Sequence, residues 1–264
     1  MEDEIYMIGG FTGWRKEFIE NVPNVNFDNP INNNQSSIAR LITDDMGAAS
    51  IKSSLAYIEK NKRLGTMSYA ELGTARAAGK PIISVDENEI KDSILEHICS
   101  YDFQTKEDCY KFLSDNPKLI SKYNPIQKIN KTKSKEPCKN VLLCGFDRLP
   151  EIENSNMFLT QDKMRYAIED FSKENDLLVV NFDKGKKHSP EGLFLMGLAY
   201  KTEIPIVLLE GNEIPYPPLV GLARRVMVGK NRFNHLNEYL TNLKSQHIED
   251  ESMVYYNLMK KFNK

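Results

Sequence analysis

Residues 54–85 read SLAYIEKNKRLGTMSYAELGTARAAGKPIISV and carry the pattern on which the fold prediction depends. The apolar run at 54–58 predicts a buried strand, and the alanine-rich stretch at 68–78 predicts a helix. Gly79-Lys80-Pro81 predicts the end of that helix, because a glycine just past a helix followed by proline is a strong stop signal. A further apolar run at 82–85 predicts the next strand. This strand–helix–strand order is typical of a βαβ unit and therefore of a parallel sheet.

The same alternation extends in both directions from this stretch. Upstream, the pattern predicts strands at 4–8 and 24–27 and helices at 14–21 and 36–50. Downstream, residues 88–122 are polar with apolar positions at helical spacing, so we expect helix there. Residues 128–137 are polar, contain four lysines and show no apolar periodicity, so we expect a solvated tether there.

After this tether the pattern restarts. Residues 140–146 again form a strand entering a glycine turn, and 176–180 resemble the strand at 54–58. Gly197 precedes Pro205 by the same interval that separates Gly73 from Pro81. We therefore predict a degenerate tandem duplication, an α/β fold with two doubly wound (Rossmann- or flavodoxin-like) parallel-sheet units. The predicted organisation is a first domain at 1–122, a linker at 123–139, a second α/β domain at 140–230 and C-terminal helices at 231–264.

Composition narrows the classes of function. The 264 residues carry 35 Lys and Arg against 37 Asp and Glu, and this balance predicts no general attraction to nucleic acid or to an anionic membrane. No apolar run is long enough to span a bilayer, and the acidic start at 1–4 differs from a secretory signal. The four cysteines have no Cys-x-x-Cys spacing, so we expect free thiols in the cytoplasm and no metal site.

Glu71 is the most informative polar residue of the opening stretch, and it has two interpretations. Ser68-x-x-Glu71 matches a capping box, in which Ser68 caps the helix and Glu71 bonds back to its amide. Alternatively, a carboxylate in the first turn of a helix that follows a parallel strand lies at the carboxyl edge of the sheet, where ligands bind. The local pattern alone favours the cap.

A wider set of motifs changes that balance. Residues 6–15 read YMIGGFTGWR, and they are followed in order by Asp28-Asn29-Pro30, by SYAELG at 68–73 and by Gly79-Lys80-Pro81. This combination resembles the nucleoside 2-deoxyribosyltransferase family over residues 4–87, while residues 140–210 share only its fold-level pattern. In that family a glutamate in the Glu-Leu-Gly segment attacks the anomeric carbon, expels the base and forms a covalent glycosyl-enzyme.

The resemblance implies a set of site residues in this sequence. Glu71 would be the nucleophile, and the backbone at Gly9 and Gly10 would approach the sugar or a phosphate closely. Trp14 would stack on a base unless it is a packing residue, and Arg15 would hold a phosphate or carboxylate unless it is a solvated charge. The remaining substrate-binding candidates are Phe11, Asp28, Asn29, Ser68 and Asp176. We expect Gly10, Trp14, Asn29 and Ser68 to line one pocket.

The sequence also departs from the family pattern. Family members carry an aspartate that binds sugar hydroxyls in the loop before the glutamate, whereas here the basic residues Lys60, Lys62 and Arg63 occupy that loop. In the second half, aligning Gly197 on Gly73 puts Leu195 at the position of Glu71, while Asp176 occupies an acidic strand start. The second half is either a built-in partner that completes the first site or a purely structural domain.

Two functions from different classes follow. The first is an enzyme, a deoxyribosyltransferase or an N-glycosidase, that cleaves the N-glycosidic bond of a nucleoside, nucleotide or related metabolite without a cofactor. The second is a non-catalytic nucleotide-binding sensor or regulatory subunit on the same fold. The resemblance also implies a homo-oligomer, and the partner in either case is a small-molecule nucleoside or nucleotide rather than nucleic acid or membrane.

Overall fold

The computed structural model describes residues 4–10, 12–33, 37–116, 118–126, 140–146, 156–159 and 177–242. It contains two five-stranded sheets in which every strand pair is parallel. The first unit comprises β1 (Ile5–Gly9), α1 (Trp14–Asn21), β2 (Phe27–Asp28), the 3-10 helix η1 (Pro30–Asn32), α2 (Ile38–Ile51), β3 (Ser53–Ile58), α3 (Thr66–Ala77), β4 (Ile82–Asp86), α4 (Ser93–Ile98), β5 (Tyr101–Phe103) and α5 (Lys106–Asp115). The second unit comprises β6 (Asn140–Cys144), β7 (Asn156–Leu159), β8 (Leu177–Phe182), α7 (Pro190–Thr202), β9 (Ile206–Glu210), α8 (Pro217–Leu222), β10 (Arg225–Val228) and α9 (Arg232–Asn242).

The two sheets have the same topology. Their strand orders are β2-β1-β3-β4-β5 and β7-β6-β8-β9-β10, so each places its first strand between its second and third. This is the flavodoxin-like doubly wound order, in which ligands bind outside the carboxyl ends of the strands near the point where the order reverses. The predicted fold class, two tandem α/β units with parallel sheets, is confirmed.

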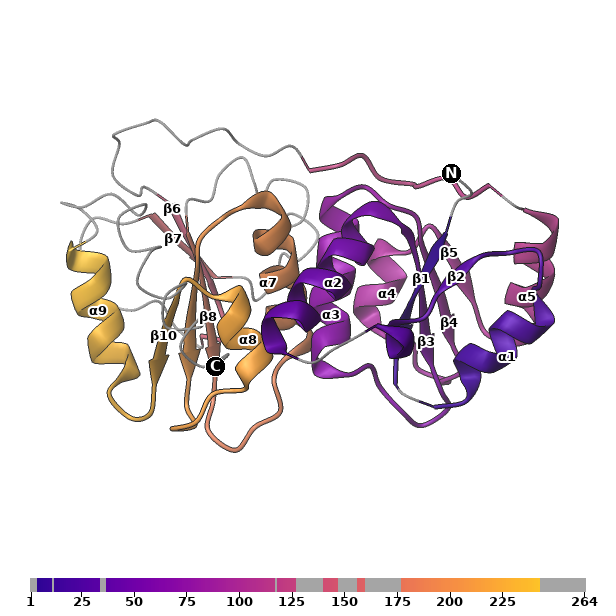
Figure 1. Cartoon of the computed structure of the whole chain (residues 1–264). Coiled ribbons are helices and arrows are strands. Elements are labelled where there is room, and N and C mark those ends of the chain that lie inside the picture. Colours follow the sequence, from indigo (N-terminus) through magenta and orange to yellow (C-terminus); the bar gives the residue numbers. More distant parts are fainter. Residues whose placement is uncertain are drawn as a thin grey trace.

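The helices form a central layer between the sheets and two outer layers. In Figure 1, α2, α3 and α4 cover one face of the first sheet and α1 and α5 cover the other. On the second unit, α7 and α8 face the first unit and α9 lies on the outside. Among the residues that the structure describes, no helix is long and apolar enough to cross a membrane.

The second half of the first unit differs from the expectation of continuous helix over 88–122. Two short helices, α4 and α5, flank the three-residue strand β5, which pairs with β4 at the edge of the sheet. A strand this short carries too little alternation to stand out from its polar surroundings, and its formation depends on the backbone groups of β4.

The described start of the expected linker belongs to the first unit. The amide of Ile126 donates a hydrogen bond of 2.8 Å to the carbonyl of Ala77, and Arg76 lies 4.1 Å above the ring of Tyr123. Residues 123–126 therefore pack against the end of α3, and residues 127–139 lie outside the described part of the chain.

The internal duplication is regular from β3 onward. The elements β8, α7, β9, α8 and β10 begin at the numbers of β3, α3, β4, α4 and β5 plus 124, without insertion or deletion. This register corrects the sequence alignment of the strand at 176–180 by two residues, so Asp176 corresponds to Lys52 rather than to a strand start. Positive φ angles also recur at equivalent positions, at Asn61 and Gly185 and at Gly79 and Glu203.

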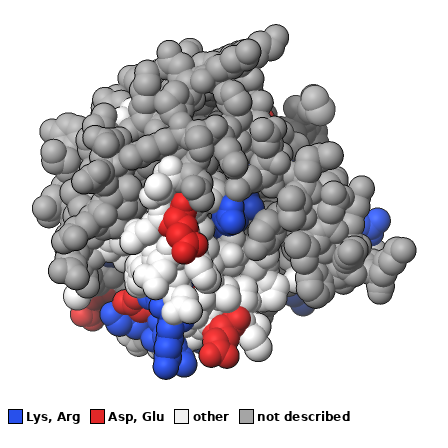
Figure 2. Space-filling model, turned by 90° about the vertical axis from the view of Figure 1, so that its left-hand side faces the viewer, with Lys and Arg blue, Asp and Glu red and all other residues white. Residues whose placement is uncertain are grey.

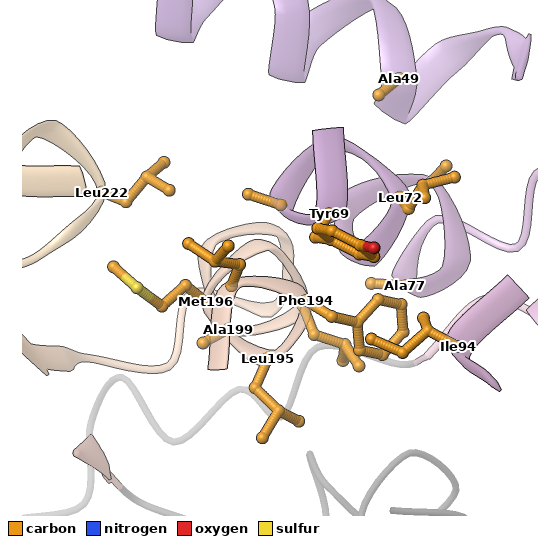
Figure 3. Packing of buried hydrophobic residues seen from close by; sticks show 14 of the residues in the cluster. Ala49, Tyr69, Leu72, Ala77, Ile94, Phe194, Leu195, Met196, Ala199 and Leu222 are labelled. Carbon is orange, nitrogen blue, oxygen red and sulfur yellow. The ribbon is translucent and has the colours of Figure 1, made fainter. Parts of the chain in front are cut away.

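The two units share one hydrophobic core through α3 and α7. A Cβ on Gly73 would overlap the carbonyl oxygen of Phe194, and a Cβ on Gly197 would overlap that of Ala70. Since Ala70 and Phe194 are counterparts in the repeat, the contact is reciprocal, as in a two-fold symmetric dimer. Figure 3 shows side chains of both helices meeting there, with Phe194 of α7 beside Ala77 of α3 and Ile94 of α4.

Candidate functional site

Glu71 lies in the second turn of α3, one turn deeper than expected. The helix begins at Thr66 with Gly65 as its N-cap, and no side chain makes a capping hydrogen bond there. The capping-box interpretation of Ser68 and Glu71 is therefore wrong, because both residues lie inside the helix. Glu71 is 7% exposed, so its carboxyl group needs an explanation other than capping.

Buried polar side chains from three other elements surround this carboxyl. Tyr6 of β1 donates a long hydrogen bond of 3.5 Å from its hydroxyl to Oε2 of Glu71. Asp45, on the buried face of α2, interacts with the Tyr6 hydroxyl and is close enough to Glu71 for the two charges to repel. Arg15 of α1 is 2% exposed, and its positive charge acts on both carboxyls.

The environment keeps Glu71 protonated at neutral pH. Burial, and secondarily the charge of Asp45, raise the pKa of Glu71 to about 8. Burial likewise raises the pKa of Asp45 to about 6, although Tyr6 and Arg15 oppose that shift. Burial and the two carboxylates raise the pKa of the Tyr6 phenol. Pairs of carboxyls whose pKa values are raised and separated in this way are typical of acid–base and nucleophilic sites.

Arg15 is fixed over the end of β1. Its guanidinium donates hydrogen bonds of 2.8 Å to the carbonyl of Gly9 and 3.0 Å to that of Gly10. Gly9 has a φ of 148°, and a Cβ there would lie 2.9 Å from the carbonyl oxygen of Tyr57, so the site requires glycine. Gly10 is exposed and has open space beside it. The carboxyl end of β1 thus places the exposed backbone of Gly10 beside the buried cation Arg15, which is therefore not the solvated charge of the alternative interpretation.

Asp45 leaves one hydrogen-bonding position open. Its Oδ1 is buried without a hydrogen-bond partner among the residues described. A buried acceptor without a donor is destabilising, and native structures contain few such atoms. Neither Asp45 nor Tyr6 was predicted from sequence. The signal for Asp45 was a carboxylate on the apolar face of its helix, between Ile42 and Ala49.

Of the other predicted residues, one lies near the Glu71 cluster, two lie at the starts of helices, and two fall outside the described part of the chain. Asp28 lies near the cluster, since its charge acts on Tyr6 and Asp45, and it forms an ion pair of 2.7 Å with Lys52. Asn29 caps η1 by accepting a hydrogen bond from the amide of Ile31. Ser68 is buried in the first turn of α3. Phe11 and Asp176 lie outside the described residues.

Trp14 lies on the opposite face of the first sheet from Glu71. Its ring packs against Phe18 and Tyr57, its indole nitrogen donates to the carbonyl of Gly10, and it is 2% exposed. Trp14 belongs to the core cluster between the first sheet and α1, whereas Ser68 is buried in the first turn of α3, and the expected pocket lined by both stays a prediction. The placement favours the packing role of Trp14 over base stacking.

A cavity of about 540 Å³ opens elsewhere on the same carboxyl edge, between the loops that follow β3 and β4. Its lining excludes Glu71 and consists of Ile58, Lys60, Asn61, Lys62, Arg63, Asp86, Asn88, Glu89, Ile90 and Asp92. The basic loop noted in the sequence therefore borders a cavity of a size that accommodates small molecules.

The second unit contributes no described polar group to the environment of Glu71. The charges that shift the pKa of Glu71 come from Asp45 and Arg15, both in the first unit. Leu195, the counterpart of Glu71, is fully buried in the shared core. What α7 supplies is a backbone contact, since Thr74 of α3 donates a hydrogen bond of 3.1 Å to the carbonyl of Gly197.

Comparisons with known proteins do not identify a family. No family model matches the chain, and no curated protein matches it. Among solved structures, a PurR-family transcriptional regulator from Vibrio parahaemolyticus RIMD 2210633 aligns with 91% of this chain and 90% of its own at 9% identity. The TM-score of 0.21 for that alignment is too low to carry an argument about fold or function.

Proposed function

We propose that the protein cleaves or transfers the N-glycosidic bond of a nucleoside, nucleotide or related metabolite, with Glu71 as the nucleophile. The observation that carries this proposal is the buried Glu71 at the carboxyl edge, grouped with Tyr6, Asp45 and Arg15. A carboxylate is suited to this chemistry because it forms a covalent glycosyl ester and departs again in a second step.

The proposed reaction has two steps and begins from the ionised form of Glu71, which is the minor form at neutral pH because its pKa is raised to about 8. An ionised Glu71 oxygen attacks the anomeric carbon, the carbon–nitrogen bond breaks, and its electron pair leaves with the base, which takes a proton from water. Water or a second base then attacks the same carbon and gives up a proton to solvent, and the carboxylate departs with the electron pair of the ester bond. The open Oδ1 of Asp45 would accept a hydrogen bond from a sugar hydroxyl, a role that the family gives to the aspartate missing from the loop at 60–64.

The test is base release from a panel of nucleosides, deoxynucleosides, nucleotides and NAD. Glu71→Gln preserves shape and hydrogen bonding but removes the nucleophile, so we expect the rate to fall by about three orders of magnitude or more. Glu20→Gln on the exposed face of α1 is the matched control and should leave the rate unchanged. Wild-type activity in a folded Glu71→Gln protein, checked by circular dichroism, would refute the proposal.

The alternative is a non-catalytic nucleotide-binding sensor. It is favoured by the loss of the glutamate in the second unit, where Leu195 stands, and by the absence of the family's aspartate from the loop before Glu71. Nucleotide binding by calorimetry without base release, in the wild type and in Glu71→Gln alike, would support this function over the enzyme.

A homo-oligomer belongs to the proposal as well. The face of α3 is already covered by α7, so a second copy would have to dock on another surface. Light scattering of the full chain would give the number of copies directly.

A further inference from the structure

The residues that line the cavity beside β3 and β4 are unusually well retained between the two repeats. Over the 51 positions from 53 to 103, only ten are identical to their counterparts at 177 to 227. Five of these ten line the cavity: Lys60, Lys62, Asn88, Glu89 and Ile90, whose counterparts are Lys184, Lys186, Asn212, Glu213 and Ile214. Over the same positions the candidate nucleophile changes from Glu71 to Leu195.

The hydrogen bonds that shape these loops are also duplicated. Asn88 is held by the Asp86 carboxylate and accepts a hydrogen bond of 2.7 Å from the amide of Asn61. In the second unit, Asn212 is held by Glu210 and accepts from the amide of Gly185 at 3.4 Å. The residues that donate these bonds, Asn61 and Gly185, both have positive φ. In each unit these asparagine hydrogen bonds, made by Asn88 or Asn212, form a brace that fixes the backbone of the basic loop.

The hydrogen bonds of the brace do not involve the side chains of the basic residues. Lys60 and Arg63 in the first unit, and Lys184 and Lys187 in the second, are exposed on the loops that the brace holds. Two of the acidic residues at the cavity are engaged by protein donors. Asp86 accepts from the amides of Asn88 and Asp92.

Asp92 is engaged as well, by the hydroxyl of Tyr69 and by two amides at the start of α4. Since protein donors already occupy Asp86 and Asp92, the charged side chains of the lining that remain to meet a ligand are Lys60, Lys62, Arg63 and Glu89, and Lys62 also forms an exposed ion pair of 3.8 Å with Glu59. An apolar contact accompanies them, because Ile90 is 90% exposed and Ile214 is 84% exposed.

We propose that each unit carries an anion-binding site at this place, which takes a phosphate-bearing small molecule of nucleotide size. The phosphate would lie against the lysines and arginine of the loop after β3 or β8, and the isoleucine would contact the apolar part of the ligand. Both loops lie at the same end of the molecule, the lower end in Figure 1. Figure 2 shows Lys and Arg side chains at that end on the side of the second unit, together with Asp and Glu.

The proposal is independent of the reaction assigned to Glu71, and calorimetry with the full chain tests it. ADP is the probe, inorganic phosphate is the test for the anion alone, and a single-stranded oligonucleotide is the test for nucleic acid. We expect Lys60→Glu with Lys62→Glu to remove one bound equivalent of ADP, and Lys184→Glu with Lys186→Glu to remove another. Glu71→Gln should change neither equivalent, and base release should be measured in every variant.

The matched control reverses two exposed lysines of the outer helices, Lys16→Glu with Lys111→Glu, and should leave the stoichiometry unchanged. A second set, Ile90→Ser and Ile214→Ser, keeps the charge and should weaken ADP binding about tenfold at its own site. ADP binding that survives all four lysine changes, no ADP binding by the wild type, or binding of the oligonucleotide alone would overturn the proposal.

Discussion

At the scale of single residues, the raised pKa of Glu71 predicts that the stability of the protein falls and its activity rises as the pH increases. A carboxyl whose pKa is raised on folding contributes stability that is fully present below its unfolded value, near 4.5, and is lost as pH rises through about 8. Attack by Glu71 requires the ionised form, so kcat/KM should rise with pH through the same region. A flat rate profile between pH 6 and 9 would contradict this assignment.

Glu71→Gln should remove the stability cost of ionisation while it removes the activity. Glutamine resembles the protonated acid, so above pH 8 we expect the variant to be more stable than the wild type, by an amount on the order of a few kcal/mol. Below pH 5 the two proteins should unfold alike. Urea unfolding at pH 5 and at pH 9 measures the difference, and equal stability at both pH values would show that the carboxyl is not desolvated as the structure implies.

The sequence predicted single residues where their roles depend on local pattern. The turn at Gly9 was predicted from its strand and glycine signals, whereas the role of Glu71 rests on the family resemblance, because the local pattern alone favours a cap that the structure does not form. Tyr6 and Asp45 were missed because their roles arise from packing between β1, α2 and α3, which are far apart in sequence. Trp14 looked like a ligand contact, but the rings of Phe18 and Tyr57 cover it.

At the scale of elements, the close packing of α3 on α7 leaves no room for a side chain at Gly73. Ala at this position would place its Cβ on the carbonyl of Phe194, which is backbone and cannot rotate away. We expect Gly73→Ala to destabilise the protein by about 1–3 kcal/mol or more, in spite of the better helix propensity of alanine.

Gly47→Ala is the matched control, because Gly47 also lies within a helix, α2, but has no neighbouring atom in reach of a new Cβ. There we expect stabilisation by about 0.5–1 kcal/mol. Thermal unfolding of both variants separates the effect of helix propensity from that of the interface. Equal changes at the two positions would contradict the close approach of the helices.

Elements were predicted best where they are buried and least well at the edges of the sheets. β3, α3 and β4 have long apolar runs and clear stop signals, so their sequence specifies them. β5 has three residues and depends on β4 for its hydrogen bonds, and this is why 88–122 was predicted as helix. The start of α3 was placed too late because Ser68 resembles a cap, whereas the helix begins at Thr66 with Gly65 as its N-cap.

At the scale of the whole molecule, the shared core predicts that the two units unfold together. One cluster of buried side chains runs from Tyr6 in β1 through α3 and α7 to Leu208 in β9, so opening either unit exposes apolar surface of the other. The chain has a single tryptophan, Trp14, which is buried in the first unit and therefore reports on that unit alone. Circular dichroism at 222 nm reports on the helices of both units.

We expect the two signals to give superimposable unfolding curves with one midpoint, since a cooperative transition has the same midpoint by every probe. A destabilising substitution in the second unit should then lower the midpoint of the tryptophan transition, although Trp14 lies in the first unit. Gly197→Ala, whose Cβ would overlap the carbonyl of Ala70, is expected to lower both midpoints equally. Gly185→Ala, on an exposed loop of the second unit with open space around it but with positive φ, is the control for local strain away from the interface. If Gly197→Ala lowered the dichroism midpoint and left the Trp14 midpoint in place, the units would be independent domains, and the reciprocal helix contact would not couple their folding.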